Sequence, residues 1–131
     1  MRKIILSLLL LCAVGLAAQV TPDPNPIPTG YTGAVTIIFD ASQGNGGMIG
    51  ATKCYAHTGL ITAASTSDTD WKNVIGSWRG TTQPQLTSLG NNKWQLDIPN
   101  IFTFYGVPET TDIKKLAFVF HDGPNGNKEG K

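Results

Sequence analysis

Short runs of β-branched and aromatic residues, separated by glycine-rich or polar loops, recur about every ten residues along this chain. Such spacing predicts short strands joined by turns, and no segment shows the periodicity of a convincing amphipathic helix. The chain is therefore expected to be all-β, an antiparallel immunoglobulin-like β-sandwich. Strands are predicted at residues 35–40, 53–61, 71–75, 85–89, 93–98 and 114–120.

Local signals place one hairpin and one helical turn within this pattern. Gly90-Asn-Asn lies between two strand-like runs and predicts a tight hairpin turn. Residues 100–105 are expected to form a helical turn, closed by Gly106 and stopped by Pro108. In the strand 93–98, Trp94 lies on the same face as two aliphatic residues and is predicted to be a core residue.

The first eighteen residues have the organisation of a secretory signal peptide. Arg2 and Lys3 precede an apolar run over 4–11, and Leu16-Ala17-Ala18 before Gln19 suits a cleavage site. The apolar run is too short to span a bilayer. Residues 1–18 thus predict a protein secreted to the periplasm, the outer cell surface or the medium, with no membrane span. A lipid anchor at Cys12 is the disfavoured alternative, because Leu11 stands where a small residue is expected.

Proline at every second position from Pro22 to Pro28 predicts an extended, semi-rigid linker over residues 19–33. The sandwich is then expected to occupy residues 34–131. Within that part Cys54 is the one cysteine, so no intrachain disulfide is expected after cleavage. A half-buried thiol acting as a small apolar residue is the simplest interpretation.

Charge argues against polyanionic partners. Cleavage after Ala18 leaves 131 − 18 = 113 residues and removes Arg2 and Lys3, so Lys plus Arg falls from 10 to 8 against 9 acidic residues. The formal charge changes from +1 to −1. A nearly neutral exported domain has no electrostatic reason to bind nucleic acid or an anionic membrane.

The C-terminal part predicts an incomplete sandwich. After the turn at 123–126 the sequence reaches Lys131 where a return strand is expected to begin. Without that strand, Phe120 would lie at an unpaired apolar edge. We therefore expect a sandwich that lacks its last strand or strands, marginal in isolation, as a fragment of a longer protein.

Residues 55–78 carry two of the three tryptophans together with a tyrosine and a histidine. Flat exposed aromatic rings with polar neighbours suit the stacking and hydrogen bonding of a sugar. Carbohydrate binding is therefore the leading hypothesis for this segment. Two alternatives remain open: Trp71 or Trp78 is a core residue, and His57 is a hydrogen-bonded structural residue rather than a ligand contact.

Catalytic and metal-binding patterns are not evident in the sequence. No pair of carboxylates is marked out for glycoside hydrolysis, and Gly-x-Ser-x-Gly is absent. Gly44-Asn-Gly-Gly47 lacks the lysine of a phosphate-binding loop, and the two histidines do not have metal-ligand spacing. The chain is therefore expected to carry no metal, no cofactor and no catalysis of its own.

The order and spacing of several segments over residues 34–131 resemble the N-terminal starch-binding-type β-sandwich of secreted bacterial alpha-amylase family proteins. The segments that carry the resemblance are Val35-Thr-Ile-Ile-Phe-Asp40, Tyr55-Ala-His-Thr-Gly59, Asp70-Trp-Lys72 with Trp78, Leu86-Thr-Ser-Leu89, Lys93-Trp-Gln-Leu96, Phe104-Tyr-Gly-Val-Pro108, Leu116-Ala-Phe-Val-Phe120 and Lys128-Glu-Gly-Lys131. The family's last strands and catalytic barrel have no counterpart in this sequence.

The resemblance implies a non-catalytic carbohydrate-binding module that binds an alpha-glucan, such as starch or a maltooligosaccharide, ahead of a catalytic domain in the same polypeptide. It implies a role in polysaccharide degradation as an accessory domain of a glycoside hydrolase. The binding residues that it implies are Tyr55, His57, Trp71, Lys72 and Trp78. The alternative is a structural spacer sandwich without a ligand.

Overall fold

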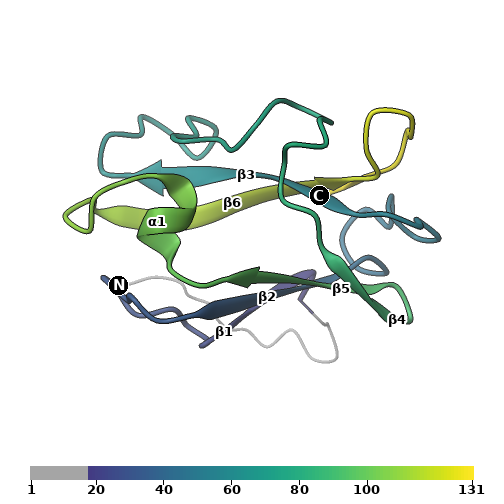
Figure 1. Cartoon of the computed structure of the whole chain (residues 1–131), viewed down its shortest axis with the longest axis horizontal. Helices are drawn as coiled ribbons and strands as arrows, with labels where there is room; N and C mark the ends of the chain where they lie inside the picture. Colours follow the sequence, from purple (N-terminus) through teal and green to yellow (C-terminus); the bar gives the residue numbers. More distant parts are fainter. Residues whose placement is uncertain (1–17) are drawn as a thin grey trace.

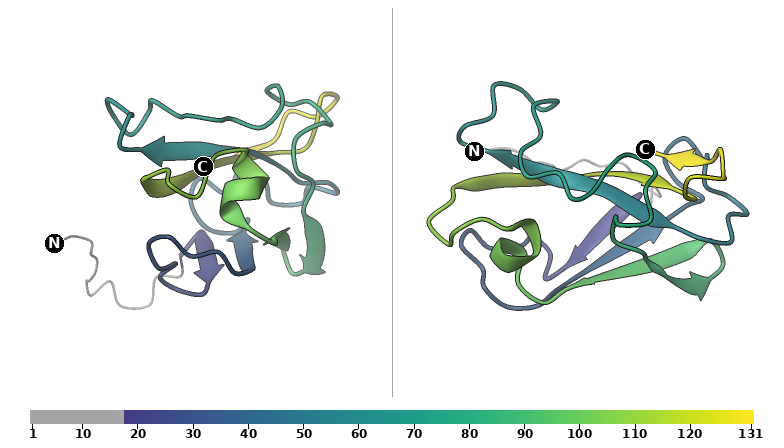
Figure 2. Two further views of the ribbon diagram at one scale, coloured as in Figure 1. Left: turned by 60° about the vertical axis from the view of Figure 1, so that its left-hand side comes forward. Right: turned by 45° about the horizontal axis from the view of Figure 1, so that its top comes forward.

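Two antiparallel sheets lie face to face in the computed structural model, which describes residues 18–131 (Figures 1 and 2). Sheet A has the strand order β1-β2-β5-β4, and sheet B has the order β3-β6-β7. The prediction of an all-β antiparallel sandwich is confirmed. The strands are β1 (Val20–Asp23), β2 (Val35–Asp40), β3 (Tyr55–Thr62), β4 (Thr87–Gly90), β5 (Lys93–Ile98), β6 (Ile113–His121) and β7 (Glu129–Gly130). The expected signal peptide falls, apart from Ala18, outside the described residues.

The core lies between the sheets and follows from alternation along the strands. On β2, Val35, Ile37 and Phe39 are buried while the residues between them are partly exposed. Phe39 pairs in register with Trp94 of β5 and stacks on Phe120 of β6, with ring centroids 3.9 Å apart. Trp94 is 6% exposed, so its prediction as a core residue is confirmed.

The predicted hairpin and helical turn are both present. Gly90, Asn91 and Asn92 all have positive φ, which glycine and asparagine adopt most readily. The helix α1 (Ile101–Tyr105) begins after Asn100, whose side chain accepts a hydrogen bond from the Thr103 N–H. It ends at Gly106 in the left-handed conformation. Within residues 18–131, no helix is long and apolar enough to cross a membrane.

Only the first part of the expected linker, Val20–Asp23, is an extended strand; bends at 24–26 and a turn at 29–30 follow it, and the strand belongs to the sandwich. Val20–Asp23 forms β1, which pairs antiparallel with β2 from Val20 opposite Phe39 to Asp23 opposite Thr36. Further along, Ile27 and Tyr31 pack against the core. Proline is tolerated here because β1 is an edge strand, and the backbone groups on its outer edge have no strand to pair with. The sandwich therefore begins before residue 34.

The strand predicted at 71–75 does not form. Lys72 makes an isolated bridge to Leu60 on β3, and the Ile75 N–H donates to the Thr58 carbonyl, but nothing continues the ladder. Asn73, between these two contacts, has a φ of 53°, in the left-handed region. That conformation turns the chain out of the extended geometry that a strand requires.

Phe120 is not left at an open edge, contrary to the expectation from the sequence. It is 1% exposed and pairs with Gly130 of the two-residue strand β7. Asn45 of the glycine-rich loop fixes β7, since its side-chain amide donates to the Glu129 carbonyl and its backbone N–H donates to Lys131. A side chain at Gly47 would overlap the Glu129 carbonyl, which explains a glycine at this crossing. The return strand therefore begins, although it covers only one end of β6.

Cys54 is fully buried rather than half-buried, and burial raises the pKa of its thiol well above the usual range. Because the thiolate is the reactive form, we expect a folded chain starting at Gln19 to react with a thiol reagent at least about 100-fold more slowly than the unfolded chain. Absorbance of the released thionitrobenzoate in buffer and in guanidinium measures both rates. Rapid stoichiometric labelling of the folded chain would show that the region around Cys54 opens readily.

Candidate functional site

The outer face of sheet B is covered by the long connection between β3 and β4, residues 63–86, which passes above β3 in Figure 1. Alternation along β3 directs Ala56, Thr58 and Leu60 inward and His57 outward. Gly59 is the outward neighbour of His57 along the strand. A Cβ at Gly59 would meet the side chain of Val74 at 2.9 Å. The glycine thus allows the connection to lie directly on the strand.

Aromatic and imidazole rings gather on this outer face. Trp78 makes edge contacts with His57 and with His121 of β6, at ring centroid distances of 5.0 and 5.3 Å. Trp71 lies 5.5 Å from His57, and Tyr55 stacks on His121 at 5.5 Å. We call these five residues, Tyr55, His57, Trp71, Trp78 and His121, the aromatic cluster.

The amide of Gln83 joins the two histidines. Its nitrogen lies 2.8 Å from His57 Nδ1 and donates to the Ile75 carbonyl at 2.8 Å, while its oxygen lies 2.7 Å from His121 Nε2. The Ile75 carbonyl identifies the amide nitrogen as the donor, so His57 Nδ1 accepts and His121 Nε2 donates. This arrangement suits neutral imidazoles. Burial lowers the pKa of His57, and burial followed by the Arg79 charge lowers the pKa of His121 to about 4.

Charged groups surround the cluster as two ion pairs. Arg79 lies over the Trp78 ring, with its guanidinium carbon 5.8 Å from the centroid, and pairs with Asp122 at 2.7 Å. Lys72 pairs with Asp70 at 3.2 Å. Hydrogen bonds from the Thr66 backbone and from Lys72 lower the pKa of Asp70. The Asp70 carboxylate therefore stays charged and helps hold the connection in place.

The five residues implied by the family resemblance lie on the same side of sheet B, but they differ in accessibility. Trp78 is 46% exposed and presents ring surface to solvent. Trp71 and Lys72 are half-buried, and the Trp71 indole N–H donates to the Asp68 carbonyl. His57 is half-buried beneath the tryptophans. Tyr55 is 6% exposed and covered by His121, so it supports the cluster rather than offering a stacking face.

Sequence reasoning missed Arg79, Gln83, His121 and Asp122. His121 is far from His57 along the chain, and only the pairing of β3 with β6 brings their rings to one face. His121 is an odd number of residues from Phe118 and from Phe120, so alternation along the strand directs it to the opposite face, outward. That signal locates His121 beside His57 only once the pairing of β3 with β6 is known. Gln83 lies in the irregular connection, where no periodicity predicts its direction.

Chemically, this face offers a half-exposed indole ring, that of Trp78, bounded by an arginine, carboxylates and an amide. Within residues 18–131 no group of three or more histidine, cysteine, aspartate or glutamate side chains is arranged to hold a metal ion. The carboxylates nearest the cluster, Asp70 and Asp122, are each engaged by a basic side chain. The arrangement therefore suits binding of a neutral polar ligand by stacking and hydrogen bonding.

These features define the class: a small all-β sandwich with an aromatic cluster on the outer face of its three-stranded sheet. The chain belongs to the family described as "Domain of unknown function (DUF8578)", whose model matches residues 24–128. That match begins ahead of residue 34, in agreement with the inclusion of the proline-rich segment in the fold. No curated protein matches the chain.

Proposed function

We propose that the chain is a non-catalytic alpha-glucan-binding module, which binds starch chains or maltooligosaccharides through the outer face of sheet B. The observation that supports this most directly is Trp78, a half-exposed indole held edge-on by two buried or half-buried imidazoles. A stacking ring needs a fixed orientation, and these contacts supply it. In an alpha-amylase family protein, such a module would hold the polysaccharide near a catalytic domain.

The polar groups around Trp78 suit sugar hydroxyls. Arg79 uses one nitrogen for Asp122 and another for the Lys128 carbonyl, and its side chain remains 18% exposed beside Trp78. Lys72 lies on the Trp71 side of the cluster with part of its side chain exposed. Together they place donors beside a stacking surface, the pairing that recognition of a pyranose ring requires.

Trp78→Ala is expected to weaken maltoheptaose binding about thirty-fold, the equivalent of roughly 2 kcal/mol, because the accessible stacking surface is lost. Trp71→Ala is expected to weaken it by a similar factor. Isothermal titration calorimetry measures both, and thermal melts check that the variants remain folded. Leu89→Ala is the matched control, since Leu89 is 50% exposed on β4 in the opposite sheet.

Two results would contradict the proposal. Wild-type affinity in both tryptophan variants would mean that any glucan site lies elsewhere. A folded wild-type chain that binds no glucan at all would favour the alternative of a structural spacer, in which the aromatic cluster only covers the outer face of β3 and β6.

A further inference from the structure

Among the strands formed by residues 18–131, none pairs with one edge of β6 over most of its length. β3 pairs with β6 from Tyr55 opposite His121 to beyond Leu60 opposite Leu116. On the other side, β7 pairs only with Phe120 and His121. Within residues 18–131, the strand order of sheet B therefore leaves β6 open on this side between Ile113 and Val119.

Alternate backbone groups of β6 at this edge point away from β3. Leu60 directs its N–H and carbonyl to Lys72, at 2.8 and 2.7 Å, and the Thr58 carbonyl accepts from Ile75. In an antiparallel ladder, two residues directly opposite each other either both direct their N–H and carbonyl groups toward the partner strand or both direct them away from it. Leu116 lies opposite Leu60, and Phe118 lies opposite Thr58. Both therefore present N–H and carbonyl groups at the free edge, as Phe120 does toward β7.

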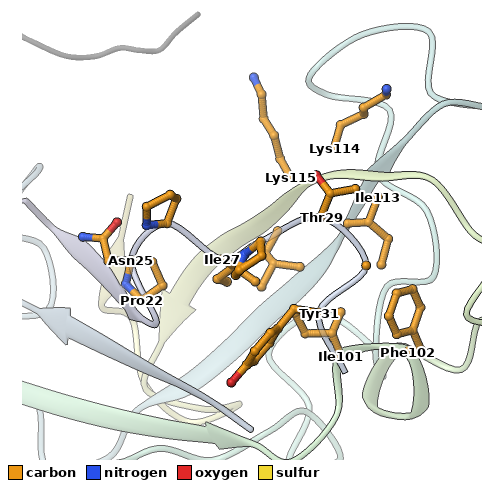
Figure 3. Close-up of a pocket in the computed structure, with 14 residues that line it drawn as sticks. Pro22, Asn25, Ile27, Thr29, Tyr31, Ile101, Phe102, Ile113, Lys114 and Lys115 are labelled. Carbon is orange, nitrogen blue, oxygen red and sulfur yellow. The ribbon is translucent and has the colours of Figure 1, made fainter. Parts of the chain in front are cut away.

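An apolar groove runs along the same edge. Two adjacent cavities of about 280 and 340 Å³ share Pro22, Ile27 and Leu116 as lining residues. Phe118 and Ile37 extend the groove toward the core, and Ile113 and α1 bound its other end. Figure 3 shows the cavity of about 280 Å³, with Ile27 and Tyr31 of the proline-rich segment among its lining residues. The walls thus come from both sheets, with β1 on one side and β6 on the other.

An extended strand is the occupant that satisfies both features. A compact apolar molecule would fill the cavities but leave the peptide groups of Leu116 and Phe118 without partners, and a helix has no free mid-chain donors to offer. The run 116–120 is apolar throughout, so none of its side chains protects the edge by charge. β7 already shows which positions of such a strand point inward, because Gly130, opposite Phe120, faces Phe39 and Met48 of the core.

We propose that this groove binds an extended polypeptide strand that runs antiparallel to β6, in line with β7, and places apolar side chains inward at alternate positions. The site is separate from the aromatic cluster, because Leu116 and Phe118 face the interior of the sandwich while His57 and His121 face outward. Strand addition to an edge draws its affinity from backbone hydrogen bonds and its specificity from alternate side chains.

The test appends about six residues after Lys131, one for each ladder position from Phe118 back to Ile113. In one chain valine takes the first, third and fifth added positions and threonine the others, so that valine faces the groove. In the control chain valine and threonine are exchanged, which turns the apolar set outward at the same composition. Hydrogen exchange of the Leu116 and Phe118 amides is followed by NMR, together with the melting temperature.

We expect the first chain to slow exchange of both amides at least about ten-fold relative to the chain ending at Lys131, and to raise the melting temperature. The control chain should give little protection. Equal protection by both chains, or none by either, would overturn the proposal. Protection of both amides in the chain without an extension, increasing with protein concentration alongside dimerisation, would mean that a second copy occupies the edge, and would also overturn it.

Discussion

Replacing Trp94 with alanine is expected to lower the free energy of unfolding by about 3–5 kcal/mol. Trp94 lies in the middle of the core, directly opposite Phe39 across β2 and β5. Truncation to a methyl group would leave a cavity that the rigid strands on either side cannot fill by relaxing. Chemical denaturation of the wild type and the variant measures the difference.

Trp78→Ala is the matched control, because it removes the same side chain from the surface. It should change the free energy of unfolding by less than about 1 kcal/mol, since Trp78 is 46% exposed. The contrast separates the core tryptophan from the surface tryptophan without any ligand. Comparable loss in both variants would show that the aromatic cluster is part of the structural core and not a surface available for binding.

Acidification from pH 7.5 to 5 is expected to reduce the free energy of unfolding by about 2 kcal/mol through His121 alone. The pKa of His121 is lowered to about 4 in the folded chain, mainly by burial and then by Arg79 and His57, against the opposing effects of Asp122 and Glu129. The unfolded chain, with an ordinary histidine pKa near 6.5, therefore binds more protons in this range. Stability falls as the pH decreases through the unfolded-state pKa, and the loss is complete below the folded-state pKa.

The hydrogen bonds give this pH dependence its structural basis. His121 Nε2 donates to Gln83, and Nδ1 accepts from the Gly123 N–H at 3.2 Å, so protonation at Nδ1 removes an acceptor from a buried N–H group. Urea unfolding at several pH values tests this in wild type and in His121→Gln, which has no titrating group at this position. The variant should show a shallower slope between pH 7.5 and 5. An unchanged slope would mean that His121 is not the group responsible.

Several parts of the fold are predictable from local sequence because residues close together in the chain determine them. Alternation along 35–40 and 93–98 identifies both strands and their inward faces, and Trp94 follows from that pattern. Asparagine and glycine adopt positive φ at little cost, so Gly90-Asn-Asn is sufficient to predict the hairpin. Asn100 and Gly106 mark the ends of α1 for equally local reasons.

The candidate site was predictable only in part. A concentration of aromatic residues between Tyr55 and Trp78 identifies the segment, but not which rings remain accessible. Burial of Tyr55 depends on His121, which arrives through the pairing of β3 with β6. Arg79 and Gln83 take their directions from an irregular connection in which Asn73, Gly76 and Arg79 itself have left-handed backbone. No periodicity exists there for a sequence argument to use.

By itself, then, the sequence determined the all-β class, the strands with clear alternation, the tight turns and the burial of Trp94. These depend on side-chain alternation and backbone preferences that act within a few residues. Only the tertiary structure decided that Val20–Asp23 joins sheet A, that Glu129–Gly130 covers Phe120, and that His57 and His121 share one face. Each of these depends on which distant segment supplies the missing backbone partner, and local preference carries no information about that partner.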